Sequence, residues 1–173
     1  YVGYRYFDTF GIKPAYEFGY GLSYTNFDIN VKNVSVNEDK VTVKAEVTNT
    51  GKTYSGKEVV QVYFSAPDSK DAEKEYQQLA AYGKTDELAP GESQVLTLTY
   101  DTDEMAYYSE EKASYILDPG TYYVRVGDSS RNTKVAAAIK LNQSAVTEVL
   151  SNQMEVPESE NLTEWSKAGK TPY

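Results

Sequence analysis

Apolar and polar positions alternate along the middle of this chain in the way expected of β-strands. "KVTVKAEVTNTG", residues 40–51, puts valine or alanine at alternate positions on one face, polar side chains on the other, and turn residues at its end. A repeat of two residues is typical of a strand with one buried face. "EVVQVYFSAP", residues 58–67, is apolar on both faces for several residues, which indicates a strand in the centre of a sheet.

The segments that follow continue this pattern. "SQVLTLTYD" (93–101) and "TYYVRVGDSS" (121–130) alternate, and "TKVAAAIKL" (133–141) is expected to close a sheet as a final strand. Two longer, charged segments, 66–76 and 101–113, are expected to be loops. Helical periodicity is missing from this region, and many short strands with frequent turns predict an all-β antiparallel sandwich or barrel.

Two Pro-Gly pairs mark turns between strand candidates. They are Pro90-Gly91 in "LAPGES" and Pro119-Gly120 in "LDPGTY". Proline presets φ at the first central position of such a turn, and glycine accepts a positive φ at the second. We therefore predict structural roles for all four residues.

Aromatic residues gather ahead of the first strand. Residues 1–27 hold ten of the 23 aromatic residues, which comprise 17 Tyr, 5 Phe and 1 Trp. One interpretation is a sugar-binding platform; the other, which we favour, is packing where two domains meet, because aromatic rings dominate interface energetics. Gly19 and Gly21 would then let the backbone turn and approach a neighbour closely. The predicted packing residues are Tyr4, Tyr6, Phe7, Tyr16, Phe18, Tyr20 and Tyr24.

The chain therefore divides into three zones. Residues 1–24 form a joint segment, 25–141 the β-domain, and 142–173 a polar, acidic linker or tail. Within the tail, Asn161 and Glu164 have the spacing of a capping box, and Gly169 is placed to end a short helix.

Composition excludes several function classes. The chain has no cysteine and no histidine, so it lacks disulfides, thiolate nucleophiles and the commonest metal ligand. A net charge of −9 argues against nucleic acid and anionic membranes as partners. The acids of "DTDE" (101–104) lack the glycine and distal glutamate of a calcium loop, so we predict no metal and no cofactor. No targeting segment is visible, which leaves a cytoplasmic and a secreted bacterial location open. A start at Tyr1 rather than Met indicates an excised segment or a processed product.

Five segments together resemble a known family. They are "YVGYRYFD", "YEFGYGLSYTNF", "VTNTGKTYSGKEVVQVYFSAP", "QLAAYGKTDELAPGES" and "LDPGTYYVRVGDSS", and they cover about residues 1–141. In this order they resemble family-3 glycoside hydrolases, the β-glucosidases and their relatives, where an α/β-sandwich domain passes into a fibronectin type III-like domain. The resemblance implies an immunoglobulin-like sandwich of about seven strands with irregular flanking segments.

The resemblance also implies a reaction for the whole enzyme. Family members hydrolyse β-linked glucose with retention, using two carboxylates about 5–5.5 Å apart. Their nucleophile is an aspartate in a Ser-Asp-Trp-like motif of a barrel domain, and that motif is absent here; the single tryptophan, Trp165, lies in "TEWSK". Their acid/base glutamate lies upstream of the joint. No catalytic residue is therefore transferred to this chain.

The expected function is that of a non-catalytic module. It would brace the catalytic domains of the same polypeptide, whose substrate is a β-glucoside, and loops 66–76 and 101–113 are candidates for the rim of the active site. The alternative is a free-standing carbohydrate-binding or adhesion module. A tail after the β-domain is unusual for the family, and it fits either a permuted order, with the barrel following, or a terminal extension.

Two structural expectations concern single residues. Arg5 is expected to form an ion pair with Asp8. Fibronectin type III domains often carry a tyrosine corner, whose hydroxyl bonds to the backbone a few residues upstream. Spacing favours Tyr123 for this role and alternation favours Tyr122, so the choice stays open.

Overall fold

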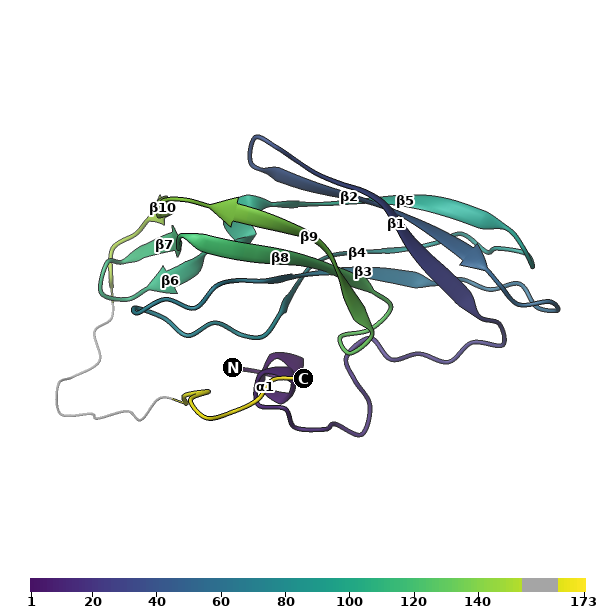
Figure 1. Cartoon of the computed structure of the whole chain (residues 1–173), viewed down its shortest axis with the longest axis horizontal. Helices are drawn as coiled ribbons and strands as arrows, with labels where there is room; N and C mark the ends of the chain where they lie inside the picture. The colour runs from purple at the N-terminus through teal and green to yellow at the C-terminus, as the bar shows by residue number, and fades with distance from the viewer. Residues whose placement is uncertain (154–164) are drawn as a thin grey trace.

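Seven strands form two facing antiparallel sheets in the computed structural model, which describes residues 1–153 and 165–173 (Figure 1). The predicted all-β sandwich is confirmed. One sheet has the order β1-β2-β5 and the other the order β4-β3-β8-β9. The strands are β1 (Phe27–Asn37), β2 (Lys40–Asn49), β5 (Ser93–Asp101), β4 (Gln78–Lys84), β3 (Val59–Ser65), β8 (Gly120–Gly127) and β9 (Thr133–Leu141).

The core lies between these sheets and follows the alternation of the sequence. The apolar face of β2, at Val41, Val43, Ala45 and Val47, has no exposure to solvent. Val60, Val62 and Phe64 of β3, with Val124 and Val126 of β8, supply the opposing layer.

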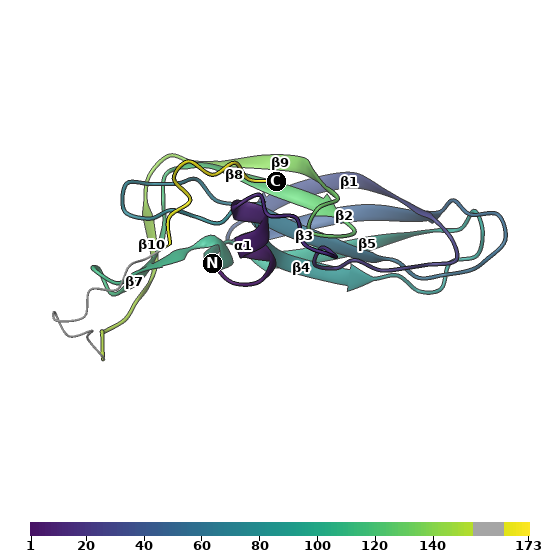
Figure 2. The same ribbon diagram turned by 90° about the horizontal axis from the view of Figure 1, so that it is seen from below.

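The other face of β3 is also buried, and the joint segment covers it. Tyr63 and Gln61 are almost completely inaccessible. The ring of Tyr4 packs edge-on against Tyr63 with the centroids 5.9 Å apart, and the backbone at Gly19 lies against the Gln61 amide. Figure 2 shows the joint helix against this face of the sandwich. The two-sided apolar pattern of β3 thus reflects a sheet on one side and a ring-rich segment on the other.

A third, smaller sheet has the order β10-β7-β6. It comprises β6 (Tyr107–Ser109), β7 (Ser114–Leu117) and β10 (Ala145–Val149), and a 3-10 helix, η1 (Thr102–Met105), precedes it. The sequence pattern predicts a loop over 101–113 and a linker or tail over 142–173, and it does not predict these elements. They are three to five residues long and pair with distant segments, which leaves little periodic signal in the sequence.

The structure describes the backbone at both Pro-Gly pairs and identifies the residue of the tyrosine corner. Gly91 has φ +81°, and Gly120 has φ +148° where an added Cβ would lie 2.7 Å from Pro67. The Tyr122 hydroxyl donates a 2.9 Å hydrogen bond to the backbone oxygen of Asp118. Tyr122 is 2% exposed and Tyr123 42%, so Tyr122 occupies the corner. Burial, with the nearby Asp118 carboxylate, raises the pKa of Tyr122 to about 12.

Both flanks of the sandwich contain order that the sequence analysis did not predict. A short helix, α1 (Tyr4–Thr9), lies within the joint segment. The predicted capping box at Asn161 and Glu164 lies outside the described residues. Where the tail is described again, a turn contains Gly169, which has φ +72°.

Candidate domain-docking interface

Helix α1 packs on the outer face of the β3–β4 pair through Tyr4. The Tyr4 ring stacks on Phe18 with a centroid separation of 4.7 Å, and its hydroxyl accepts a 2.7 Å hydrogen bond from the Leu79 backbone N–H. That N–H belongs to β4, beside the irregularity where the register shifts between Val62 and Tyr63. The joint therefore satisfies a backbone donor of the sheet that it covers.

The centre of the contact is a buried ion pair between Asp8 and Arg131. The carboxylate is 1% exposed and accepts a 2.9 Å bond from Arg131 Nε, which lies between β8 and β9. Burial raises the pKa of Asp8, although the Arg131 charge and hydrogen bond act in the opposite direction. The predicted Arg5–Asp8 pair is wrong, because Asp8 is held inside the fold within reach of Arg131. Arg5 instead pairs with Glu75 at 3.3 Å.

The last nine residues, 165–173, here called the C-terminal strap, return to α1 (Figure 1). The Tyr173 N–H donates a 2.9 Å bond to the Asp8 backbone oxygen, and the Arg131 guanidinium lies 4.5 Å from the centre of the Tyr173 ring. The backbone at Gly11 passes so near the strap that a Cβ there would lie 2.3 Å from the Thr171 oxygen. Both ends of the described chain thus meet on one side of the sandwich.

Strap residues also hold the loop 66–76. Lys167 Nζ donates 2.7 Å bonds to Asp68 Oδ1 and to the Lys74 backbone oxygen. Trp165 packs edge-on against Tyr6, with ring centroids 5.4 Å apart. The sequence pattern does not predict these contacts or the Asp8–Arg131 pair. The partners are roughly 90 or more residues apart, and no local pattern signals such pairs.

The second half of the joint is different, because most of its rings face solvent. Leu22 is 90% exposed and Tyr24 92%. With Tyr54, whose ring centroid lies 6.1 Å from that of Tyr24, these residues form what we call the exposed aromatic patch. Its members are Tyr16, Phe18, Tyr20, Leu22, Tyr24 and Tyr54. Large apolar side chains left exposed in this way are typical of an interaction site.

The predicted packing rings therefore fall into two groups. Tyr4 and Tyr6 pack inside this chain and Phe7 lies at the edge of that contact, whereas the predicted rings from 16 to 24 belong to the patch. Gly19 has φ +84°, and a Cβ there would lie 2.1 Å from Gln61 Nε2. Around Gly21 the space for a Cβ is open, so the described residues place no steric demand for glycine there.

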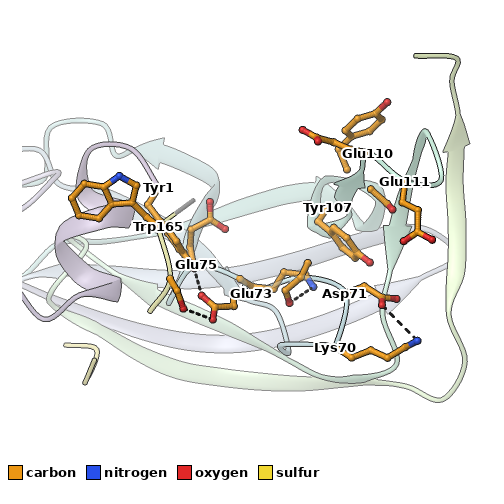
Figure 3. Close-up of a pocket in the computed structure, with 14 residues that line it drawn as sticks. Tyr1, Lys70, Asp71, Glu73, Glu75, Tyr107, Glu110, Glu111 and Trp165 are labelled. Carbon is orange, nitrogen blue, oxygen red and sulfur yellow. Dashed lines mark hydrogen bonds and ion pairs between the residues drawn. The ribbon is translucent and has the colours of Figure 1, made fainter. Parts of the chain in front are cut away.

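The two charged loops and the strap enclose a cleft of about 780 Å³ (Figure 3). Tyr1 and Trp165 line one part and Tyr107 another, with carboxylates between them. Much of this charge is already paired. Glu73 accepts bonds from the Ser166 hydroxyl and the Lys167 N–H, which lower its pKa, and Asp71 lies 3.6 Å from both Lys70 and Lys112.

Metal and membrane sites receive no support from the described residues. Across 1–153 and 165–173 no three acidic side chains are grouped so as to hold a metal ion. The acids of "DTDE" instead form a capping box for η1, between Asp101 and Glu104. No helix in the same ranges is long and apolar enough to cross a bilayer.

Comparison with known proteins identifies the class. Residues 58–130 match the family described as "Fibronectin type III-like domain". The chain is 40% identical over 131 residues to a β-glucosidase of Kluyveromyces marxianus, covering 75% of this chain and 15% of that protein. It is 39% identical over 182 residues to β-glucosidase A of Butyrivibrio fibrisolvens, covering 92% and 22%.

Solved structures agree with these relatives. A β-glucosidase from Paenibacillus barengoltzii superimposes with a TM-score of 0.84 at 41% identity, covering 88% of this chain and 18% of that one. β-Glucosidase 3B from Thermotoga neapolitana gives 0.77 at 44% identity, covering 86% and 20%. The fold is thus a fibronectin type III-like domain. The chain belongs to the group of such domains found in family-3 β-glucosidases, and it spans about a fifth of the length of these relatives.

Proposed function

We propose that this chain is the bracing module of a retaining family-3 β-glucosidase and that it contributes no catalytic residue. The carrying observation is the exposed aromatic patch, on a chain that spans only about a fifth of its relatives. Leaving rings such as Tyr20 and Tyr24 in water forfeits the free energy of their burial, so a neighbouring domain is the natural cover. The zones 1–24, 25–141 and 142–173 remain our division into joint, sandwich and linker.

The position of the two ends supports the bracing role. Because the strap lies on α1, segments continuing from Tyr1 and Tyr173 would leave from the same side of the sandwich. A module attached in this way holds its two neighbours against each other. The same geometry fits the permuted domain order, in which a barrel follows Tyr173.

Substitution of the patch in the longer protein tests the proposal. Tyr20→Ser, Leu22→Ser and Tyr24→Ser together should lower the melting temperature and kcat/KM on an aryl β-glucoside, while the free energy of unfolding of the isolated chain stays unchanged. Tyr82→Ser, on the 72% exposed Tyr82 of β4, is the control and should change neither. An unaffected triple variant would contradict the bracing role.

A finer part of the proposal concerns the cleft between the charged loops. Aromatic faces and carboxylates are groups that bind sugars, so this cleft is our candidate for a contribution to the active-site rim. Trp165 is the chain's single tryptophan and lines the cleft, so its fluorescence reports on occupancy. In the longer protein, Trp165→Phe should raise KM for cellobiose and leave kcat unchanged; an unchanged KM would exclude the rim role.

The free-standing carbohydrate-binding module is not favoured, since the relatives named above are β-glucosidases of which the chain matches one part. The purified chain is expected to leave an aryl β-glucoside intact. Hydrolysis by the isolated chain would overturn the assignment of a non-catalytic role.

A further inference from the structure

We propose that a small pocket in the joint, beside the exposed aromatic patch, receives a positively charged side chain, arginine or lysine, from the domain that covers the patch. This inference rests on the proposed function for the identity of that neighbour. The pocket, here called the joint pocket, has a volume of about 210 Å³ and is separate from the cleft of Figure 3.

The walls of the joint pocket are aromatic. Tyr4 and Phe7 of α1 line it together with Tyr16 and Phe18 from the second half of the joint. Aromatic faces attract a cation through the ring quadrupole, and the attraction grows as water is excluded. Tyr4 and Phe18 are already stacked 4.7 Å apart, so this wall is formed before any ligand arrives.

The polar residues of the joint pocket are acceptors that lack sufficient partners. Asp8 lines it, and its Oδ2 receives a long, 3.4 Å bond from the Gln77 amide. Glu17 lines it with a single 3.5 Å contact from Ser129. Ser130 is 1% exposed, and its hydroxyl lies beside the Asp8 carboxylate, whose pKa it lowers, without a hydrogen bond of good geometry among the described residues. A buried polar group without a partner is costly, so a donor entering here would satisfy it.

Charge favours a cation over a neutral donor. Two carboxylates line the joint pocket, none of its lining residues is basic, and Arg131 pairs with Asp8. Burial raises the pKa of Asp8, and its contacts with Arg131, Gln77 and Ser130 act in the opposite direction. By contrast, Asp71 and Glu73 of the larger cleft are bonded to lysines, to Ser166 or to backbone.

The joint pocket and the exposed aromatic patch are adjacent and share residues. Tyr16 and Phe18 belong to both, so a domain that covers the patch also covers the pocket mouth. Apolar contact would then exclude water around the cation, which strengthens its attraction to Glu17 and the rings.

Titration of the full 173-residue chain with N-acetyl-arginine amide tests the inference. Backbone amide NMR shifts of Glu17, Phe18 and Ser130 should move saturably. The citrulline analogue has nearly the same shape without the charge, so it should bind on the order of tenfold more weakly. Arginine shifts elsewhere on this acidic chain, with none at these three residues, would overturn the proposal.

Two matched substitutions separate the joint pocket from general acidity. Glu17→Gln should weaken arginine amide binding on the order of fivefold. Glu111→Gln, in the larger cleft, removes the same charge and should leave binding unchanged. Equal loss in both variants would show non-specific attraction and contradict the proposal.

The result is independent of the bracing role. Failed binding together with an impaired triple patch variant would refute the cation pocket alone. Binding together with an unimpaired triple variant would refute the bracing function, and with it the neighbouring domain as the source of the cation.

Discussion

The two halves of the joint segment have similar aromatic content, but they differ in how far their rings pack inside this chain. Residues 1–12 pack Tyr4 and Phe10 against their own sandwich and strap, whereas the rings from Tyr16 to Tyr24 are between 46% and 92% exposed. In the first half, helix α1 places Tyr4 and Asp8 four residues apart on one face, toward partners in this chain. The second half follows the surface without regular structure, held by the Ser130 N–H bond to the Phe18 oxygen. What decides burial is therefore whether a partner exists within the chain, and ring content does not.

The largest effect in a test of this difference is expected from removing the Asp8–Arg131 ion pair, which holds the first half of the joint on the sandwich. Asp8→Ala leaves the Arg131 charge partly buried without its carboxylate, and we expect a loss of about 3 kcal/mol in the free energy of unfolding. Chemical denaturation followed by circular dichroism measures it. Arg5→Ala, which removes the partly exposed pair with Glu75, is the control, with an expected loss below about 1 kcal/mol. Equal losses in the two variants would contradict a central role for Asp8.

A smaller effect on stability is expected from removing the hydrogen bond between the Tyr4 hydroxyl and the backbone of β4. Tyr4→Phe keeps the ring and removes the acceptor for the Leu79 N–H, at a cost of about 1 kcal/mol. Tyr16→Phe is the matched change in the second half, and it should alter the free energy of unfolding by less than about 0.5 kcal/mol. If the two substitutions cost the same, the halves do not differ as the structure indicates.

The sequence predicts the sandwich well and the joint poorly, for a physical reason. The alternation at 40–51 and the turn at Pro90-Gly91 are local signals, and both appear in the structure as predicted. The ion pair between Asp8 and Arg131 joins residues that are 123 positions apart, and no local sequence pattern near either residue predicts it. Ring density in the joint indicates a packing surface, but it does not say which rings find partners inside the chain.

The strap gives a still smaller test, with a control inside the same segment. Lys167→Gln removes the bonds to Asp68 and to the Lys74 oxygen, and should cost about 0.5 kcal/mol. Lys170→Gln removes the same charge from an exposed side chain and should cost nothing measurable. Release of the strap would separate Trp165 from Tyr6, so Trp165 fluorescence should change only in the first variant.

Acid should loosen the strap in the same sense. Burial alone would raise the pKa of Asp68, but bonds from Lys167 and from the Lys74 N–H hold it below its ordinary 3.8. A carboxylate with a lowered pKa stabilises the docked strap above its ordinary pKa, and this contribution is lost as pH falls through the lowered value. The pKa of Asp8 is raised, so its contribution to the stability of the fold is lost as pH rises rather than as pH falls. Global unfolding would combine the two opposing contributions, so strap release is followed instead by Trp165 fluorescence as the pH is lowered. In the Lys167→Gln variant this acid-induced change in fluorescence should be smaller.

The smallest effect on stability, and the sharpest test of the contrast, belongs to Tyr24. Its side chain is 92% exposed, so Tyr24→Ser removes almost no buried area and should leave the free energy of unfolding within about 0.5 kcal/mol of the original. An apolar patch without its cover favours self-association, so the same substitution should lower the apparent mass of the isolated chain in sedimentation at high concentration. Tyr82→Ser, also on an exposed ring but outside the patch, should leave the mass unchanged. A stability loss at Tyr24 as large as that at Tyr4 would mean that both halves of the joint serve this chain alone, and the case for a covering neighbour would fail.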